Sequence, residues 1–247
     1  MQKKVAAIIP AAGLGKRFGS RGGKTLHLLS GRPLLAWVLE VFQQCGMIDE
    51  ILPVLKSEDR DAGWALVERY GITKVRRIVP GGDERQDSVF NGIEALGEEP
   101  SAVVIHDGAR PLVEGFLIER ALEGLKGYDG AVAGVPVKDT IKAAKPSSPA
   151  QAAPGQHGGA PESEAVVEGT LDRMTLWAIQ TPQAFPLDRI REAHRRARAE
   201  GFYGTDDAAL IERYGGAVRI VMGSYRNIKV TTPEDILVAE ALLKGRP

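Results

Sequence analysis

Small residues and long cations are mixed in the segment that follows the first apolar run of the chain. The segment reads Pro10-Ala-Ala-Gly-Leu-Gly-Lys-Arg17 and continues to Gly22-Gly-Lys24. Glycine and alanine let a backbone approach a ligand closely, and the N–H groups of such a loop form a concave anion site. Arg17 and Lys24 suit a polyphosphate better than a packed core. The pattern favours a phosphate-binding loop over a plain connection, although neither common nucleotide motif, G-K-[ST] or G-x-G-x-x-G, is present.

A second glycine pair opens another charged loop, which reads Gly81-Gly-Asp-Glu-Arg-Gln-Asp-Ser88. One interpretation is a simple turn, with the following helix N-capped by Asp87 or Ser88. The other depends on the position of the loop between an apolar strand and a helix. Ligands of open α/β sheets bind beyond the carboxyl ends of the strands, where this loop and the first one would be neighbours.

A third motif, His106-Asp-Gly-Ala-Arg-Pro111, places a carboxylate at the end of an apolar run. An aspartate in that position is a natural Mg²⁺ ligand beside phosphates. A capped turn held by an ion pair between Asp107 and Arg110 is the alternative. The four histidines of the chain show no metal-ligand spacing, and the pattern is compatible with His106 being a core or edge residue without a functional role.

Three shorter polar groups complete the candidates: Lys138-Asp-Thr140, Asp172-Arg173 and Arg226-Asn-Ile-Lys-Val-Thr231. A lone lysine within an apolar run such as Ile-Lys-Val is usually a solvated edge residue, so the pattern alone gives Lys229 no role. No arrangement of Ser, His and Asp among these groups suggests acyl transfer.

The elements that must position these loops alternate between short apolar runs and segments of helical periodicity. Such alternation predicts an α/β fold with a largely parallel sheet. Strands are expected at 5–9, 51–55, 75–79, 102–106, 130–137 and 218–221. Helices are expected from Pro33 to just before Gly46, at 60–70, 88–96 and 114–126, and from Thr232 onward.

One stretch interrupts this alternation. Residues 143–169 contain seven Ala, four Pro, four Gly and three Ser without an apolar period, a composition that cannot build a core. Strand-like runs flank the stretch on both sides. We therefore expect an extended arm over 137–176 with a flexible tip at 143–169, and an interdomain linker is the alternative.

The overall composition restricts the class of protein. The 247 residues are 43% apolar and 26% charged, which is ordinary for a globular chain. Lys+Arg and Asp+Glu both number 32, so no global charge favours nucleic acid or a membrane surface, and any anion site must be local. Cys45 is the only cysteine, which excludes an internal disulfide and fits the cytoplasm. Lys3 and Lys4 before an apolar stretch resemble a signal peptide, but Pro10 and the glycines argue against one.

Taken together and in this order, the motifs closely resemble those of the 2-C-methyl-D-erythritol 4-phosphate cytidylyltransferase family. The shared pieces also include the run Gln180-Thr-Pro-Gln-Ala-Phe185. The resemblance implies a three-layer, Rossmann-like nucleotidyltransferase fold with a mostly parallel mixed sheet and a protruding β-arm. It also implies one cytidylyltransferase domain over 1–247, in which 137–176 is a dimerisation arm.

The resemblance assigns roles residue by residue. Those expected to bind CTP are Pro10, Ala11, Ala12, Gly13, Gly15, Gly82, Asp83 and Ser88. Those expected to act on the reacting phosphates are Arg17, Lys24 and Lys229. Those expected to bind the acceptor are Asp107, Thr140, Arg173 and Asp206, with Asp107 also holding Mg²⁺. In the family the arm swaps between subunits of a homodimer, so Thr140 and Arg173 would complete the partner subunit's acceptor site.

Two other functions stay open. A cytidylyltransferase for another alditol phosphate, such as ribitol 5-phosphate, would share the same chemistry, although Thr140 and Arg173 favour methylerythritol phosphate. A non-catalytic nucleotide sensor on the same fold is the second alternative. The presence of Arg17, Lys24, Asp107 and Lys229 together argues against it, because a sensor could lose the reaction-centre cations.

Overall fold

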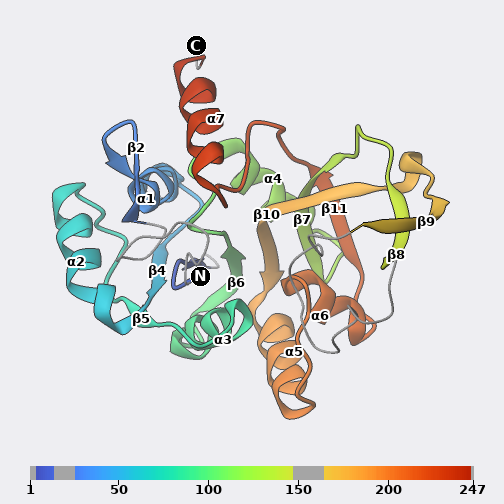
Figure 1. Cartoon of the computed structure of the whole chain (residues 1–247). Coiled ribbons are helices and arrows are strands. Elements are labelled where there is room, and N and C mark those ends of the chain that lie inside the picture. Colours follow the sequence, from blue (N-terminus) through green and yellow to red (C-terminus); the bar gives the residue numbers. More distant parts are fainter. Residues whose placement is uncertain (1–3, 14–25, 147–163, 246–247) are drawn as a thin grey trace. The chain divides into compact units, whose positions relative to one another are not determined.

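The computed structural model describes residues 4–13, 26–146 and 164–245 (Figure 1). Residue contacts divide the chain into two compact units, one made of residues 1–134 and 179–247 and the other of Val135–Ala178. Among the described residues, no helix is both long and apolar enough to cross a membrane.

A seven-stranded mixed sheet forms the centre of the first unit. In sheet order its strands are β11 (Val218–Met222), β7 (Gly130–Pro136), β10 (Trp177–Pro186), β6 (Pro100–Ile105), β1 (Lys4–Pro10), β4 (Glu50–Leu55) and β5 (Val79–Pro80). Strand β1 pairs in parallel with β4 and β6, and β10 runs antiparallel to β6. The carboxyl ends of β1, β5 and β6 therefore point to the same edge of the sheet.

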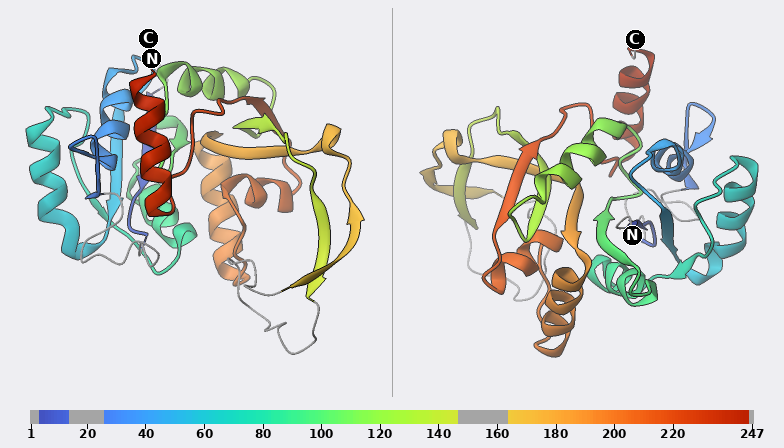
Figure 2. Two further views of the ribbon diagram at one scale, coloured as in Figure 1. Left: turned by 45° about the horizontal axis from the view of Figure 1, so that its top comes forward. Right: turned by 180° about the vertical axis from the view of Figure 1, so that it is seen from behind.

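Helices cover both faces of this sheet, as Figure 2 shows. They are α1 (Leu34–Gln44), α2 (Arg60–Arg69), α3 (Arg85–Ala95), α4 (Gly115–Gly124), α5 (Leu187–Ala199), α6 (Asp207–Arg213) and α7 (Pro233–Lys244). Side chains of β1 alternate between two cores: Ala7 and Ile9 pack in the core that includes α1, α2 and α4, whereas Ala6 and Ile8 pack in the one with α3, α5 and α6. Because both faces are covered, β1 is apolar from Val5 to Pro10, as is usual for parallel strands. The predicted three-layer α/β fold is confirmed.

A third, smaller core fixes the segment before the last helix. Val230 packs with Leu34, Leu112 and Ala239, so α7 and β2 (Leu28–Leu29) with its hairpin partner β3 (Arg32–Pro33) enclose it. Thr232 caps α7 reciprocally with Asp235, which places the start of this helix where the sequence predicts it.

Two of the predicted elements in the first unit have a boundary that differs by three residues or more. The expected strand 75–79 is mostly irregular: only its last residue enters β5, and Val75 forms a single bridge to Ile51. Helix α3 starts at Arg85, three residues before the predicted 88, because Glu84 is the N-cap and forms a capping box with Asp87. A cap at Asp87 or Ser88 was therefore the wrong expectation.

The second unit contains a two-stranded antiparallel ribbon, β8 (Lys142–Pro146) with β9 (Ala165–Thr170). Lys142 pairs with Thr170, and a short 3₁₀ turn, Arg173–Thr175, follows. Both ends of the expected tip 143–169 thus belong to strands, since backbone pairing along a ribbon does not require an apolar period. The rest of that tip, 147–163, lies outside the described residues.

Candidate active site

A pocket lies at the carboxyl ends of β1, β5 and β6. Its wall is formed by the segments that follow these strands and by one residue from the segment before α7. The lining residues are Pro10, Ala11, Ala12, Gly13, Gly82, Asp83, Glu84, Arg85, Ser88, Asp107, Ala109 and Lys229. Every predicted CTP-binding residue that the structure describes is among them, together with Asp107 and Lys229. The structure thus brings together loops that the sequence placed on the same sheet edge.

The first two loops meet where only small residues fit. Gly81 donates its N–H to the Leu55 carbonyl at 2.7 Å, and a Cβ on Gly81 would collide with the Ala12 side chain. A Cβ on Gly82 would collide with Asp87. Ser88 then accepts the Gly82 N–H at 3.2 Å, which fixes the turn. Glycine is required at both positions because a side chain would collide with Ala12 or Asp87, so Gly82 lines the pocket with backbone atoms alone.

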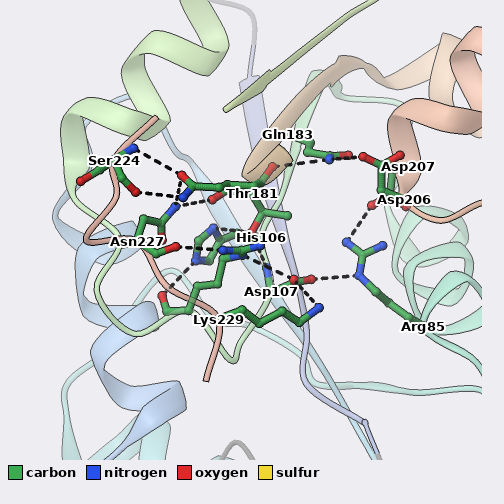
Figure 3. Close-up of polar contacts among 12 residues, drawn as sticks. Arg85, His106, Asp107, Thr181, Gln183, Asp206, Asp207, Ser224, Asn227 and Lys229 are labelled. Carbon is green, nitrogen blue, oxygen red and sulfur yellow. Dashed lines mark hydrogen bonds and ion pairs between the residues drawn. The ribbon is translucent and has the colours of Figure 1, made fainter. Parts of the chain in front are cut away.

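Asp107 is the centre of the charged part of the pocket (Figure 3). Its Oδ1 accepts from Arg85 Nε at 2.9 Å, and its Oδ2 lies 2.9 Å from Lys229 Nζ and 3.7 Å from Arg110 Nε. Burial alone would raise the pKa of this carboxyl, but the charges of Arg85, Lys229 and Arg110 outweigh it and hold the pKa well below its usual range. The carboxylate is therefore ionised and surrounded by cations.

Arg85 joins this centre to a second carboxylate behind it. Its Nη2 lies 2.9 Å from Asp207 Oδ2, and the other Asp207 oxygen lies 3.3 Å from His194 Nε2. The side chain of Asp207 is only 1% exposed. Burial disfavours the charged form of Arg85, yet the neighbouring Asp207 and Asp107 raise its pKa. Neither Arg85 nor Asp207 was given a role from the sequence, because they are distant in the chain and no spacing rule connects them.

A directed set of hydrogen bonds fixes the backbone that carries Asp107. The N–H of Asp107 donates to Thr181 Oγ1 at 3.0 Å, and Thr181 Oγ1 lies 3.0 Å from His106 Nδ1. His106 Nε2 lies 3.2 Å from the Arg110 carbonyl, which can only accept. Nε2 is therefore the protonated nitrogen of neutral His106, and Nδ1 accepts from the threonine. Burial is the main cause that lowers the pKa of His106 to about 4, so the imidazole is neutral at pH 7.

Asn227 fixes the segment that carries Lys229. Its side-chain Nδ2 donates to the backbone carbonyl of Thr181 at 2.7 Å, and the backbone carbonyl of Asn227 accepts from Arg110 Nη1 at 2.8 Å. Val230 N donates to the Ala109 carbonyl at 2.8 Å. The segment is thus tied to β10 and to the turn after β6, and Lys229 faces Asp107. In the sequence this lysine has the pattern of a solvated edge residue. That its backbone is held in place becomes visible only in the structure, where Asn227, two positions earlier, is buried.

Other predicted residues lie elsewhere. Asp206 is the N-cap of α6: Oδ1 accepts from Ala209 N at 2.9 Å and Oδ2 from Gln183 Nε2 at 2.7 Å, and it does not line the pocket. Thr140 and Arg173 belong to the second unit, where Arg173 Nη1 donates to the Lys138 carbonyl at 3.0 Å. Their acceptor roles stay predictions. Gly15, Arg17 and Lys24 lie outside the described residues.

The predicted metal role of Asp107 fits this arrangement poorly. Both of its oxygens already pair with cations, so a dication would have to compete with Arg85 and Lys229 for them. Within the described ranges, no cluster of three or more His, Cys, Asp or Glu side chains could hold a metal ion. Mg²⁺ normally requires near-octahedral oxygen ligands, which these side chains do not offer without a substrate.

The fold and the pocket define a class of protein. A three-layer α/β sheet with a small-residue loop after β1 and a cation cluster at the carboxyl ends of its strands is typical of enzymes that bind nucleotides and other phosphorylated substrates.

Comparison with known proteins identifies the family. A family model described as 2-C-methyl-D-erythritol 4-phosphate cytidylyltransferase matches residues 5–245. The protein of that name from Geotalea uraniireducens is 45% identical over 245 residues, or 98% of this chain and 97% of its own. A crystal structure of 4-diphosphocytidyl-2C-methyl-D-erythritol synthase from Anaerococcus prevotii superposes with a TM-score of 0.81 at 30% identity, covering 98% of this chain and 96% of that one. For the Thermus thermophilus cytidylyltransferase the TM-score is 0.73 at 30% identity, with 99% and 100% covered. The chain belongs to the 2-C-methyl-D-erythritol 4-phosphate cytidylyltransferase family.

Proposed function

We propose that this chain transfers CMP from CTP to 2-C-methyl-D-erythritol 4-phosphate, giving 4-diphosphocytidyl-2-C-methyl-D-erythritol and pyrophosphate. The observation that carries the proposal is the pocket itself: the glycine- and alanine-containing segments after β1 and β5 meet the Asp107 centre and its cations in one cavity. Membership of the family supports the choice of both substrates.

The reaction is an in-line displacement at the α-phosphorus of CTP. An oxygen of the acceptor's phosphate forms a new P–O bond, and the bond from the α-phosphorus to the oxygen bridging the β-phosphate breaks, so pyrophosphate leaves with that electron pair. A phosphomonoester has a second pKa near ~6 and is mostly dianionic at pH 7, so the nucleophile needs no general base. This agrees with a pocket whose nearby His106 is buried, neutral and bonded on both nitrogens.

The difficulty that the enzyme must overcome is charge repulsion. A dianion has to approach a triphosphate, so catalysis depends on neutralising and aligning the two anions. Lys229, whose side chain is 41% exposed and lines the pocket, supplies one cation at the reaction centre. Arg17 and Lys24 are proposed, from the family resemblance, to hold the triphosphate. Asp107 is proposed to accept hydrogen bonds from the acceptor's hydroxyl groups.

The nucleotide is proposed to lie against the small-residue wall. Gly82, Asp83 and Ser88 would read the cytosine, and the segment from Pro10 to Gly13, with Gly15, would cradle the rest of CTP. The position of Gly82, Asp83 and Ser88 in the wall of the same pocket as Pro10 to Gly13 supports this.

Nucleotidyltransferases generally use a divalent metal, and Mg²⁺ is the proposed ion here. Because Asp107 is already paired, we propose that Mg²⁺ is held chiefly by the triphosphate when CTP binds. The only cysteine, Cys45, is buried and free, which fits our proposal that the protein works in the cytoplasm.

A homodimer is proposed, in which Thr140 and Arg173 of each arm complete the partner subunit's acceptor site. Mixing two defective variants tests this. Lys229→Ala and Arg173→Ala chains, allowed to exchange subunits, should recover about a quarter of wild-type activity at low acceptor concentration, because half the dimers are mixed and each has one intact site. No recovery despite subunit exchange would place Arg173 in its own subunit's site, or outside any site.

The test of the function is pyrophosphate release from CTP with no acceptor, with 2-C-methyl-D-erythritol 4-phosphate and with ribitol 5-phosphate. Release that depends on the methylerythritol phosphate supports the proposal. Faster release with ribitol 5-phosphate would assign another acceptor. CTP binding without release under any condition would identify a sensor.

A further inference from the structure

The proposed reaction gives no role to the ion pair between the side chains of Arg85 and Asp207, which lies beside Asp107. Arg85 is the first residue of α3, and its backbone is fixed by the capping box of Glu84 and Asp87. Its guanidinium lies between carboxylates from two other elements: Asp107, just after β6, and Asp207, at the start of α6. A single side chain thereby connects three elements at the sheet edge (Figure 3).

Arg85 is poorly placed to act as a phosphate ligand. Its Nε is bonded to Asp107 and its Nη2 is paired with Asp207, so two of its three nitrogens face carboxylates. The side chain is only 29% exposed. An arginine that grips phosphate normally offers its paired donors to the anion. Here those donors are directed to the protein, which indicates that Arg85 acts on Asp107.

Asp207 is the fixed end of this connection. Its side chain is 1% exposed, it does not line the pocket, and its second oxygen faces His194 of α5. Its Oδ2 lies 2.9 Å from Arg85 Nη2, and the attraction of the two charges, with a hydrogen bond between the side chains, favours the ionised form of both groups. Asp207 therefore holds Arg85 mainly by charge, and in a buried site that charge is little screened by water.

The consequence concerns the two oxygens of Asp107. With Oδ1 occupied by Arg85, only Oδ2 is directed at Lys229. If Arg85 were released, Asp107 could rotate and engage Lys229 with both oxygens, which would draw the lysine away from the phosphates it must neutralise. The backbone of Asp107 would stay in place, because its N–H is held by Thr181.

We propose that Asp207, acting through Arg85, is a positioning residue that fixes the orientation of the Asp107 carboxylate and thereby keeps Lys229 available to the reacting phosphates. This inference rests on the proposed function, since it concerns use of the acceptor and the transfer step. The Arg85–Asp207 pair would thus affect the rate of the transfer reaction, although Asp207 does not line the pocket.

The experiment is a double-mutant cycle with pyrophosphate release as the assay. The wild-type protein is measured first. The cycle tests this pair only if the wild type releases pyrophosphate in a way that depends on the acceptor. Asp207→Asn should lower kcat/KM for the acceptor by at least about tenfold, the size expected when a catalytic group is displaced by a fraction of an ångström. The KM for CTP should change by less than about twofold, because the nucleotide wall is not touched.

The double variant shows whether Asp207 acts through Arg85 or whether its replacement simply disturbs the fold. In an Arg85→Gln background, Asp207→Asn should have no further effect, because its influence passes through Arg85. Additive losses would overturn the proposal, as would equal changes in the CTP and acceptor parameters. Asp129→Asn is the matched control: it also removes a carboxylate paired with an arginine, Arg189 at 3.1 Å, but away from the pocket, and it should leave kcat/KM unchanged.

A second variant covers the case in which Asp207→Asn does not fold. Arg85→Lys keeps the positive charge but replaces the planar guanidinium, which holds Asp107 and Asp207 through two different nitrogens, by a single ammonium nitrogen that cannot reproduce both contacts in the same geometry. It should reproduce the acceptor-specific loss. Full activity of Arg85→Lys would show that bridging both carboxylates is not needed and would refute the proposal. If wild type itself releases no pyrophosphate with any acceptor, the proposed function fails instead.

Discussion

The burial of His106 makes the stability of the fold depend on pH in a defined window. Burial, more than any other cause, lowers the pKa of this imidazole from 6.5 to about 4. In the unfolded chain the imidazole takes up a proton below pH 6.5, whereas in the folded chain it stays neutral until pH 4. The unfolded state therefore binds more protons between these values, and the free energy of unfolding falls as the pH is lowered through them.

The magnitude follows from the difference between the two pKa values. Within the window the free energy of unfolding changes by about 1.4 kcal/mol per pH unit. From pH 7 to pH 5 the loss is about 2 kcal/mol, and below pH 4 it reaches about 3 kcal/mol. The ion-paired carboxylates Asp107 and Asp207, whose pKa values are lowered, keep their contribution until the pH falls below the ordinary aspartate value near 3.8. The interval from pH 7 to pH 5 therefore separates the histidine from the carboxylates.

The assay is urea unfolding at pH 7 and pH 5, at a fixed protein concentration, for wild type and His106→Asn. The variant should be less stable at pH 7 by about 1–3 kcal/mol, because Thr181 and the Arg110 carbonyl lose their partner. Its stability should fall less than that of wild type on acidification, by about 2 kcal/mol. Equal pH dependence of the two proteins would refute the reasoning. So would a ¹⁵N NMR titration in which His106 of the folded protein protonates near pH 6.5.

Three further predictions concern the pocket. Lys229→Ala should lower kcat by about 100-fold or more, roughly 3 kcal/mol of transition-state stabilisation, and steady-state kinetics with an unchanged kcat would remove the lysine from the reaction centre. Gly81→Ala should destabilise the fold by about 1–3 kcal/mol and raise the KM for CTP, because the new Cβ collides with Ala12, whereas Gly97→Ala has open space around it and should be silent in both measurements. Asp107→Asn should raise the acceptor KM by about tenfold or more while leaving the half-saturating Mg²⁺ concentration unchanged; a higher Mg²⁺ requirement would restore the carboxylate as a metal ligand.

The parts of the site that the sequence predicted are those set by local pattern. Loops after apolar strands were assigned to one edge of a parallel sheet, and the structure places the segments after β1, β5 and β6 around one pocket. For the loop from Gly81 to Ser88 the sequence offered a turn or a loop on the ligand side of the sheet, and in the structure Gly82 and Ser88 line the pocket. Such features follow from residue type and strand order alone.

The parts that were missed depend on contacts between distant segments. Arg85 was quoted as part of a motif without a role, because its significance comes from Asp107 and Asp207, which reach it from β6 and α6. The acceptor role of Asp206 stays a prediction: in the structure Asp206 caps α6, and its neighbour Asp207 is the residue paired with Arg85. Helical phase alone does not distinguish two adjacent aspartates. A β-arm was expected, but β8 and β9 extend into the stretch 143–169 that was predicted to be a flexible tip, since a ribbon rich in Ala and Lys has no apolar period to reveal its strands.

The central claim, that this pocket joins CTP to an alditol phosphate through the α-phosphorus, is tested most directly by ³¹P NMR of the protein with CTP, Mg²⁺ and 2-C-methyl-D-erythritol 4-phosphate. We expect the acceptor's monoester signal to be replaced by two coupled diphosphate signals as an equal amount of pyrophosphate accumulates. An unchanged acceptor signal, whether CTP stays intact or is hydrolysed to CMP, would contradict it.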